Sequence, residues 1–147
     1  MIKIKPLAEQ NIDPGQVKAL TLAYVGDASY ELYIRRHLVL GGLAKPQSLQ
    51  RHATYYVSAK AQAGLITMMQ ETGLLTDEEL EIFRRGRNAH SHTHAKNTKV
   101  ATYKLSTGFE AVIGYLELKN DRQRVDELCA WCVKQIEEGK LAKYDFE

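Results

Sequence analysis

Two carboxylates four residues apart, Asp27 and Glu31, lie within the stretch ALTLAYVGDASYELYIRRHLVL, residues 19–40. At helical spacing, this stretch forms a stripe that consists of Leu20, Ala23, Asp27, Glu31, Ile34 and Leu38. An ionised carboxylate in an otherwise apolar stripe is costly unless it is paired, hydrogen-bonded or bound to a metal ion. The stripe therefore predicts either ion pairs with Lys or Arg, a position at the rim of the core, or a site for a hard cation.

A further carboxylate, Glu110, lies on a second predicted helix, which follows Thr98. The apolar face of this helix consists of Leu105, Phe109, Val112, Ile113 and Leu116. Beside it runs a small, polar face that consists of Tyr103, Ser106, Thr107, Glu110 and Gly114. Two helices that each direct an acid inward are typical of a hard-cation site, and Mg²⁺ takes one or two carboxylates together with waters and phosphate oxygens.

Positive charge is concentrated in one segment, RRGRNAHSHTHAKNTKVATYK, residues 84–104, which contains no acid. Its polar and basic candidates for RNA contact are Arg84, Arg85, Arg87, Asn88, Lys96, Lys99 and Lys104. The preceding ETGLLTDEELE, residues 71–81, carries acids and no base, so a net charge of +2 hides the asymmetry. The segment predicts phosphate binding, and the alternative is a solvated loop with ion pairs to the acidic stretch. The alternating His90, His92 and His94 are expected to be exposed to solvent rather than to bind a metal.

About five helices must position these residues, and no segment alternates with the period of a strand. The expected helical regions run from Asp13-Pro14 to Gly41-Gly42, from Pro46 to Gly73, from a capping box at Thr76–Glu79, from Thr98, and from Asp121 toward Gly139. Gly26 indicates that the first helix begins late or that another backbone approaches it closely. The last residues, LAKYDFE, are expected to be loose. We therefore predict an all-α fold with one domain over residues 1–147.

Composition is that of an ordinary globular protein, with 44% hydrophobic and 26% charged residues in 147. No apolar run approaches the length of a membrane span, and the N-terminus lacks the apolar core of a signal peptide. A cytoplasmic location without membrane contact is expected. Cys129 and Cys132 form a CxxC inside a predicted helix, so we expect two packed cysteines rather than a redox or zinc motif.

Two long segments together resemble the ribonuclease III catalytic domain: LAYVGDASYELYIRRHL, residues 22–38, and RRGRNAHSHTHAKNTKVATYKLSTGFEAVIGYLEL, residues 84–118. Gly26-Asp27-Ala28 resembles the signature of that family, and residues 109–114, FEAVIG, resemble its second conserved block. VSAKAQA, residues 57–63, resembles the Mini-III branch of the family.

The resemblance implies that Asp27 and Glu110 are catalytic residues that bind Mg²⁺. Three further positions where the family usually carries acids hold Leu20, Ala23 and Thr107 here, and the Mini-III branch is similarly reduced. Glu31 and Thr107 are expected to act from behind the metal ligands, by orienting a ligand or a bound water.

By the same resemblance, the protein is a homodimeric, Mg²⁺-dependent endoribonuclease that cuts double-stranded RNA and leaves 5′-phosphate ends. The implied substrate is precursor ribosomal RNA at the ends of the large-subunit RNA, with an assembling ribosomal subunit or a ribosomal protein as a possible partner. No double-stranded-RNA-binding domain is expected in residues 1–147, so the basic segment must supply affinity. The alternatives are a non-catalytic, ribosome-associated RNA-binding relative and a helical protein-interaction module.

Overall fold

The computed structural model describes residues 1–90 and 98–147. Over these residues the fold consists of α1 (Ala19–Leu40), α2 (Pro46–Val57), α3 (Ala59–Glu71), α4 (Asp77–Asn88), α5 (Val100–Leu118) and α6 (Arg122–Glu137). Short 3₁₀ turns are η1 (Leu7–Glu9), η2 (Pro14–Gln16) and η3 (Lys140–Lys143). Because this described part contains helices and no strand, the prediction of an all-α fold is confirmed. None of its helices is long and apolar enough to cross a membrane.

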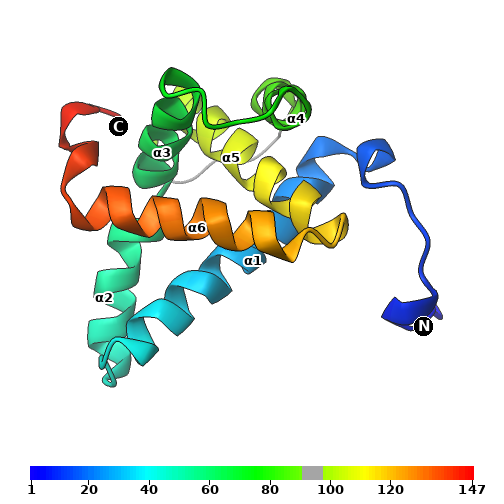
Figure 1. The fold of residues 1–147 in the computed structure, drawn as a ribbon, viewed down its shortest axis with the longest axis horizontal. Helices are drawn as coiled ribbons and strands as arrows, with labels where there is room; N and C mark the ends of the chain where they lie inside the picture. The colour runs from blue at the N-terminus through cyan, green and yellow to red at the C-terminus, as the bar shows by residue number, and fades with distance from the viewer. Residues whose placement is uncertain (91–97) are drawn as a thin grey trace.

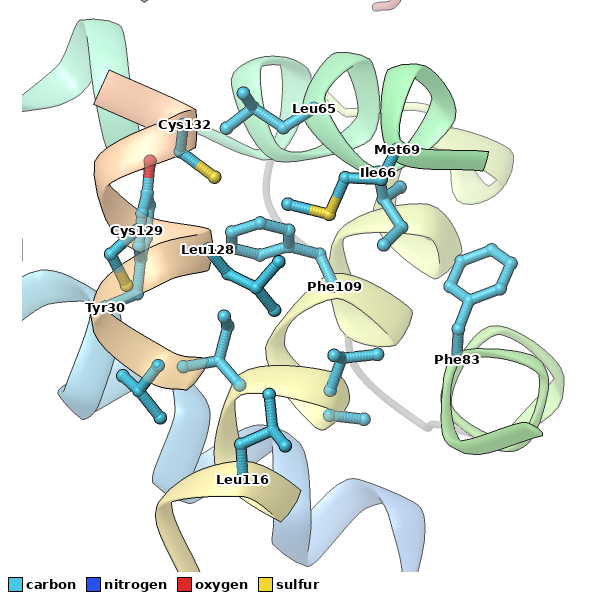
Figure 2. Packing of buried hydrophobic residues seen from close by; sticks show 14 of the residues in the cluster. Tyr30, Leu65, Ile66, Met69, Phe83, Phe109, Leu116, Leu128, Cys129 and Cys132 are labelled. Atoms are coloured by element: carbon cyan, nitrogen blue, oxygen red, sulfur yellow. The ribbon is translucent and has the colours of Figure 1, made fainter. Parts of the chain in front are cut away.

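Helix α5 is the central element, and it packs against α1, α3, α4 and α6 (Figure 1). Phe109 of α5 lies at the centre of the core, near Leu65 of α3 and Leu128 of α6 (Figure 2). The Tyr30 ring of α1 meets it edge to face, with 4.9 Å between centroids. The polar face predicted for this helix is also buried, at Thr107 for example, because neighbouring helices cover α5 on several sides.

Side-chain caps mark the starts of three of the six described α-helices, α3, α4 and α6. Thr76 and Glu79 form the expected capping box at the start of α4, and Asp121 caps α6 through the amide of Arg124. Asp13 caps only the short turn η2, and α1 begins later, at Ala19. The first helix therefore begins later than Asp13-Pro14, as one of the two expectations for Gly26 had it. The other expectation is also met, because the backbone of α5 approaches Gly26 closely.

The single helix expected between Pro46 and Gly73 is wrong, because Ser58 divides it into α2 and α3. Ser58 has extended backbone angles (φ −63°, ψ 156°), and its hydroxyl accepts a hydrogen bond from the amide of Ala61 at 3.2 Å. Serine competes with the helix for backbone hydrogen bonds, which favours a cap over a continuous helix.

The last residues were expected to be loose, and that expectation is also wrong. The Tyr144 hydroxyl hydrogen-bonds Glu71 at the end of α3, and the Glu147 carboxylate pairs with Lys99 at 2.8 Å. In Figure 1 the chain returns after α6 to lie beside α3, on the side of the molecule away from the N-terminus. The tail is thus fastened to the end of α3 and to Lys99, the residue before α5.

We expect Arg124→Ala to lower the free energy of unfolding by about 3 kcal/mol, because it strands a partly buried carboxylate. The guanidinium of Arg124 donates to both oxygens of Glu79, at 2.8 and 2.7 Å, and to the carbonyl of Leu74 at 2.8 Å. Arg122, exposed and paired with Glu117 at 3.0 Å, is the matched control, and its alanine variant should lose less than about 1 kcal/mol. Urea denaturation measures both, and equal losses would contradict the assignment.

Candidate active site

Helices α1 and α5 cross in backbone contact at the residues that flank the candidate carboxylates. A Cβ atom on Gly26 would lie 1.7 Å from the carbonyl oxygen of Glu110, and a Cβ on Gly114 would lie 1.8 Å from that of Leu22. Only glycine permits this approach. Because Asp27 follows Gly26 directly, the crossing places its carboxylate and that of Glu110 in the lining of one hollow.

The buried stripe of α1 shares Ala23, Ile34 and Leu38 with the predicted one, but Leu22, Gly26 and Tyr30 are buried in place of Leu20, Asp27 and Glu31. Its buried residues include Leu22, Gly26, Tyr30, Ile34 and Leu38. Leu20 is 40% exposed, and Asp27 is exposed as well, so the prediction of a stripe centred on the acids is wrong in this respect. One residue turns a helix by about 100°, which moves Asp27 from the centre of the packed face to its edge.

A solvent-open hollow of about 290 Å³ lies over the crossing. It is lined by Leu20, Ala23, Tyr24, Asp27, Tyr103, Thr107 and Glu110. The three positions at which the chain departs from the ribonuclease III pattern, Leu20, Ala23 and Thr107, are all in this lining. The Thr107 hydroxyl donates to the carbonyl of Tyr103 at 3.0 Å. The hollow therefore has two carboxylates set among apolar and hydroxyl groups.

Burial raises the pKa of Glu110 to about 8, and the charge of Asp27 and a hydrogen bond with it act in the same direction. Glu31 adds a smaller repulsion, while its own carboxylate pairs with Arg35 at 2.7 Å. Across residues 1–90 and 98–147, neither Asp27 nor Glu110 has a Lys or Arg partner. Such a pair holds negative charge that the protein itself does not neutralise, which is the condition a divalent cation would relieve.

Sequence reasoning missed Gln62, a buried polar residue of α3. Its side chain is 2% exposed and donates to the carbonyl of Val57 at 3.2 Å, and it acts to lower the pKa of Glu110 against the larger effect of burial. The only signal in the sequence was its place in VSAKAQA, which resembled the Mini-III branch without indicating a role.

The two arginines at the start of the basic segment have different surroundings. Arg84 is exposed and makes a long ion pair with Glu81 at 3.5 Å, as the solvated-loop alternative expects. The guanidinium of Arg85 donates to the carbonyls of Gly15 and Val17, at 3.1 and 2.6 Å. Arg85 thereby fastens the turn before α1 to α4, so its donors are used within the fold.

Other polar members of the segment also have partners. Arg87 lies over the Phe83 ring, 5.4 Å from its centroid, and donates to the Asn88 side chain at 3.2 Å. Lys99 pairs with Glu147, which lowers its availability for phosphate. These contacts are at or near the surface, where ion pairs are weak enough to exchange for a phosphate.

Lys104 is exposed on α5, next to a residue that lines the hollow. His90 is exposed, as expected. Lys96, His92 and His94 lie outside the residues that the structure describes, so the predictions for them remain predictions.

No group of three or more His, Cys, Asp or Glu side chains is arranged to hold a metal within residues 1–90 and 98–147. Two carboxylates with water and phosphate oxygens suit magnesium, which does not need an all-protein cage. Cys129 and Cys132 are buried on α6, and burial raises the pKa of both thiols, to about 12 for Cys129. The prediction of two packed, unreactive cysteines is consistent with this placement.

The profile of the ribonuclease III domain family matches residues 20–121, which include both carboxylates and the helices that hold them. Together with the helical fold, this match shows that the chain belongs to the ribonuclease III domain family. A crystal structure of a Fusobacterium nucleatum protein superposes with a TM-score of 0.75 at 27% identity, over 84% of this chain and 99% of that one.

Within this family, the most informative relatives are Mini-III ribonucleases, and this chain is one of that branch. Mini-ribonuclease 3 of Streptococcus pneumoniae is 52% identical over 126 residues, covering 86% of this chain and 98% of that protein. Mini-ribonuclease 3 of Enterococcus faecalis is 53% identical, covering 86% and 96%. The chain is therefore an endoribonuclease, and its substrate is RNA.

We expect the stability of the metal-free protein to fall as the pH rises from about 4.5 to about 8. The folded chain keeps a proton on Glu110 in this window, while the unfolded chain, with a pKa near 4.5, has lost it. The stability that depends on protonated Glu110 is fully present below pH 4.5. As the pH rises to about 8, the free energy of unfolding falls by about 1 kcal/mol per pH unit. Urea denaturation in EDTA should show a flatter profile for Glu110→Gln, with higher stability than the parent at pH 8. Parallel profiles would contradict the raised pKa.

Proposed function

We propose that this chain is a magnesium-dependent endoribonuclease that cuts double-stranded RNA during ribosome biogenesis, in the maturation of the ends of large-subunit precursor rRNA. The observation that supports it most is the approach of Asp27 and Glu110 at the α1–α5 crossing, in an open hollow without a cationic side chain among the described lining residues. Residues 1–147 would act as one domain.

The two candidate metal ligands differ in their burial. Asp27, at the exposed edge of α1, and Glu110, half-buried behind it, would together hold Mg²⁺. When bound, this ion lowers the pKa of a water and neutralises charge on the scissile phosphate, which needs no protein nucleophile. Glu110 would give up its proton as the ion binds. Thr107 lines the same wall, and Glu31 would modulate the charge of the pair from one turn away.

The basic segment would bind the RNA duplex, and a homodimer would position it over the two sites. A-form RNA is recognised mainly through its shape, phosphates and 2′-hydroxyls. A homodimer with two-fold symmetry could place one site on each strand, since duplex RNA has an approximate two-fold axis. Arg84, Arg87, Asn88, Lys96, Lys99 and Lys104 are the proposed RNA contacts; Arg85 leaves this set because its donors hold the turn before α1. A ribosomal protein or the assembling subunit would present the natural substrate.

The deciding experiment incubates the purified protein with a perfect RNA duplex labelled at one end, with Mg²⁺ or with EDTA. The proposal expects cleavage in Mg²⁺ only, with 5′-phosphate and 3′-hydroxyl ends. Precursor rRNA fragments that contain the large-subunit ends should then be cut at discrete positions. Metal-independent cleavage would contradict the proposed chemistry, and binding without cleavage on both RNAs would favour the non-catalytic alternative.

Arg84→Ala and Lys104→Ala should each weaken RNA binding and reduce the salt dependence of the affinity by about one unit of slope in a log–log plot. Both side chains are exposed and carry no strong ion pair among the described residues. Arg85→Ala is the matched control: it should lower the thermal midpoint and leave the salt slope of the folded protein unchanged. Fluorescence anisotropy in EDTA, at several salt concentrations, measures the slopes. If only Arg85→Ala reduced the salt slope, Arg85 would be the RNA contact, and Arg84 and Lys104 would not.

A further inference from the structure

The tail, residues 140–147, lies along α3 and reaches the residue before α5 (Figure 1). The Leu141 side chain packs against the core. A Cβ atom on Gly64 of α3 would lie 3.3 Å from the side chain of Leu141 and 3.6 Å from that of Tyr144, so both residues rest on α3. The Tyr144 hydroxyl also hydrogen-bonds Glu71 at the end of that helix. These contacts fix the path of the tail.

Glu147 makes two contacts with Lys99, the N-cap residue of α5. Its carboxylate pairs with Nζ of Lys99 at 2.8 Å, and its backbone carbonyl accepts a hydrogen bond from the Lys99 amide at 3.0 Å. Because the backbone bond holds Glu147 beside the lysine, its carboxylate stays at a high local concentration there. The ion pair raises the pKa of Lys99 and lowers the pKa of Glu147, which favours the charged form of each side chain.

This ion pair differs from the other one described for the basic segment. Arg84 pairs with Glu81 at 3.5 Å, three residues before it on the same helix. The partner of Lys99 instead comes from the tail, beyond α6 in the sequence. A carboxylate and a phosphate are both anions that accept charge-assisted hydrogen bonds from an ammonium group. The tail therefore presents an anion at the place where an RNA phosphate would bind Lys99.

We propose that the tail is an autoinhibitory strap, in which the Glu147 carboxylate occupies the place of an RNA phosphate on Lys99 and leaves when the duplex binds. This regulation rests on the proposed function, because it presumes that Lys99 is an RNA contact. Both side chains are exposed, so the pair is weak enough for RNA to displace it. None of residues 140–147 lines the hollow, so the strap acts on RNA binding and leaves the two carboxylates as they are.

The test compares affinities for a perfect RNA duplex, measured by fluorescence anisotropy in EDTA at about 0.1 M salt. Glu147→Gln keeps the shape of the side chain and the backbone bond to Lys99, and it removes the competing charge. It should tighten RNA binding about two- to fivefold, the range for an exposed ion pair. Glu138→Gln is the matched control. It removes the same charge from an exposed acid that pairs with Lys140 at 3.2 Å, outside the basic segment, and should have a smaller effect.

A double-mutant cycle shows whether the effect passes through Lys99. Lys99→Ala is measured in the parent and in Glu147→Gln. The loss of affinity should be about two- to fivefold larger in Glu147→Gln, because in the parent the strap already masks the ammonium group. Circular dichroism reports folding, and Lys99→Gln replaces Lys99→Ala if the alanine variant unfolds.

The outcomes separate the strap from the proposed RNA contacts. If Glu147→Gln binds RNA as the parent or as Glu138→Gln does, the strap is overturned. Equal losses from Lys99→Ala in both backgrounds also overturn it, because Glu147 would then not mask this lysine. If Lys99→Ala has no effect in either background while Arg84→Ala and Lys104→Ala weaken binding, the strap fails and the rest of the basic segment stands. If all three variants bind RNA as the parent does, the proposed RNA contacts themselves fail.

Discussion

Asp27→Asn should reduce cleavage of an RNA duplex by about 10³-fold or more while the protein stays folded. The substitution keeps the shape of the side chain and removes the charge that would bind the cation. Metal ions contribute several kcal/mol to the stabilisation of such transition states, and each 1.36 kcal/mol is a factor of about ten in rate. Because Asp27 is exposed at the edge of α1, its loss leaves the core unchanged.

Glu31→Gln is the matched control for this experiment. It removes a carboxylate one helical turn away, which pairs with Arg35 and does not line the hollow. A reduction of about tenfold at most is expected, in keeping with a residue that acts through the ligands. Single-turnover cleavage at saturating Mg²⁺ separates the two variants. Rates of Asp27→Asn within tenfold of the parent would remove Asp27 from the catalytic site.

Gly26→Ala should lower the free energy of unfolding by about 3 kcal/mol or more and abolish cleavage of whatever protein remains folded. The added methyl group would lie 1.7 Å from the backbone oxygen of Glu110 and 2.8 Å from the amide nitrogen of Gly114. Neither is the end of a side chain that could move aside, so the helices must separate, and overpacking of this kind exceeds the usual cost. Separation would also draw Asp27 away from Glu110.

Gly64→Ala, another helical glycine, provides the control. Its Cβ would lie 3.3 Å from Cδ2 of Leu141, the end of a flexible side chain on η3. Because alanine is the better helix former, this variant should be neutral or more stable by up to about 1 kcal/mol. Urea denaturation and duplex cleavage are measured on both. Normal cleavage and stability of Gly26→Ala would show that the tight crossing is not required.

The hollow contains fewer acids than the ribonuclease III pattern, because Asp27 and Glu110 are the only acids among its described lining residues. At positions where the family pattern has further carboxylates, Leu20 and Ala23 make part of the wall of the hollow apolar. At the third such position, the Thr107 hydroxyl donates its hydrogen bond to the backbone carbonyl of Tyr103 within α5. In the proposed function, Asp27 and Glu110 would then carry the whole cation-binding task. Because the pKa of Glu110 is raised, the proposed binding would be proton-coupled, and apparent Mg²⁺ affinity should increase toward pH 8.

The amino-acid sequence alone determined the class of the fold, the caps at Thr76 and Asp121, and the family. These features are local or are patterns along the chain: a capping box needs four residues, and helical periodicity is visible in any one segment. The sequence also named Asp27 and Glu110 as a pair, through the resemblance of the two blocks that contain them. That assignment remains a prediction that cleavage assays must decide.

Only the tertiary structure decided which groups surround that pair. Periodicity shows that a helix has a packed face but not which helix covers it, and an error of one residue turns a side chain by about 100°. The offset of the α1 stripe, the use of Arg85 to hold the turn before α1, and the influence of Gln62 on the pKa of Glu110 all depend on helices that are distant in sequence. Such contacts are set by how the helices cross, and here that crossing depends on glycines whose role becomes visible only when the two backbones meet.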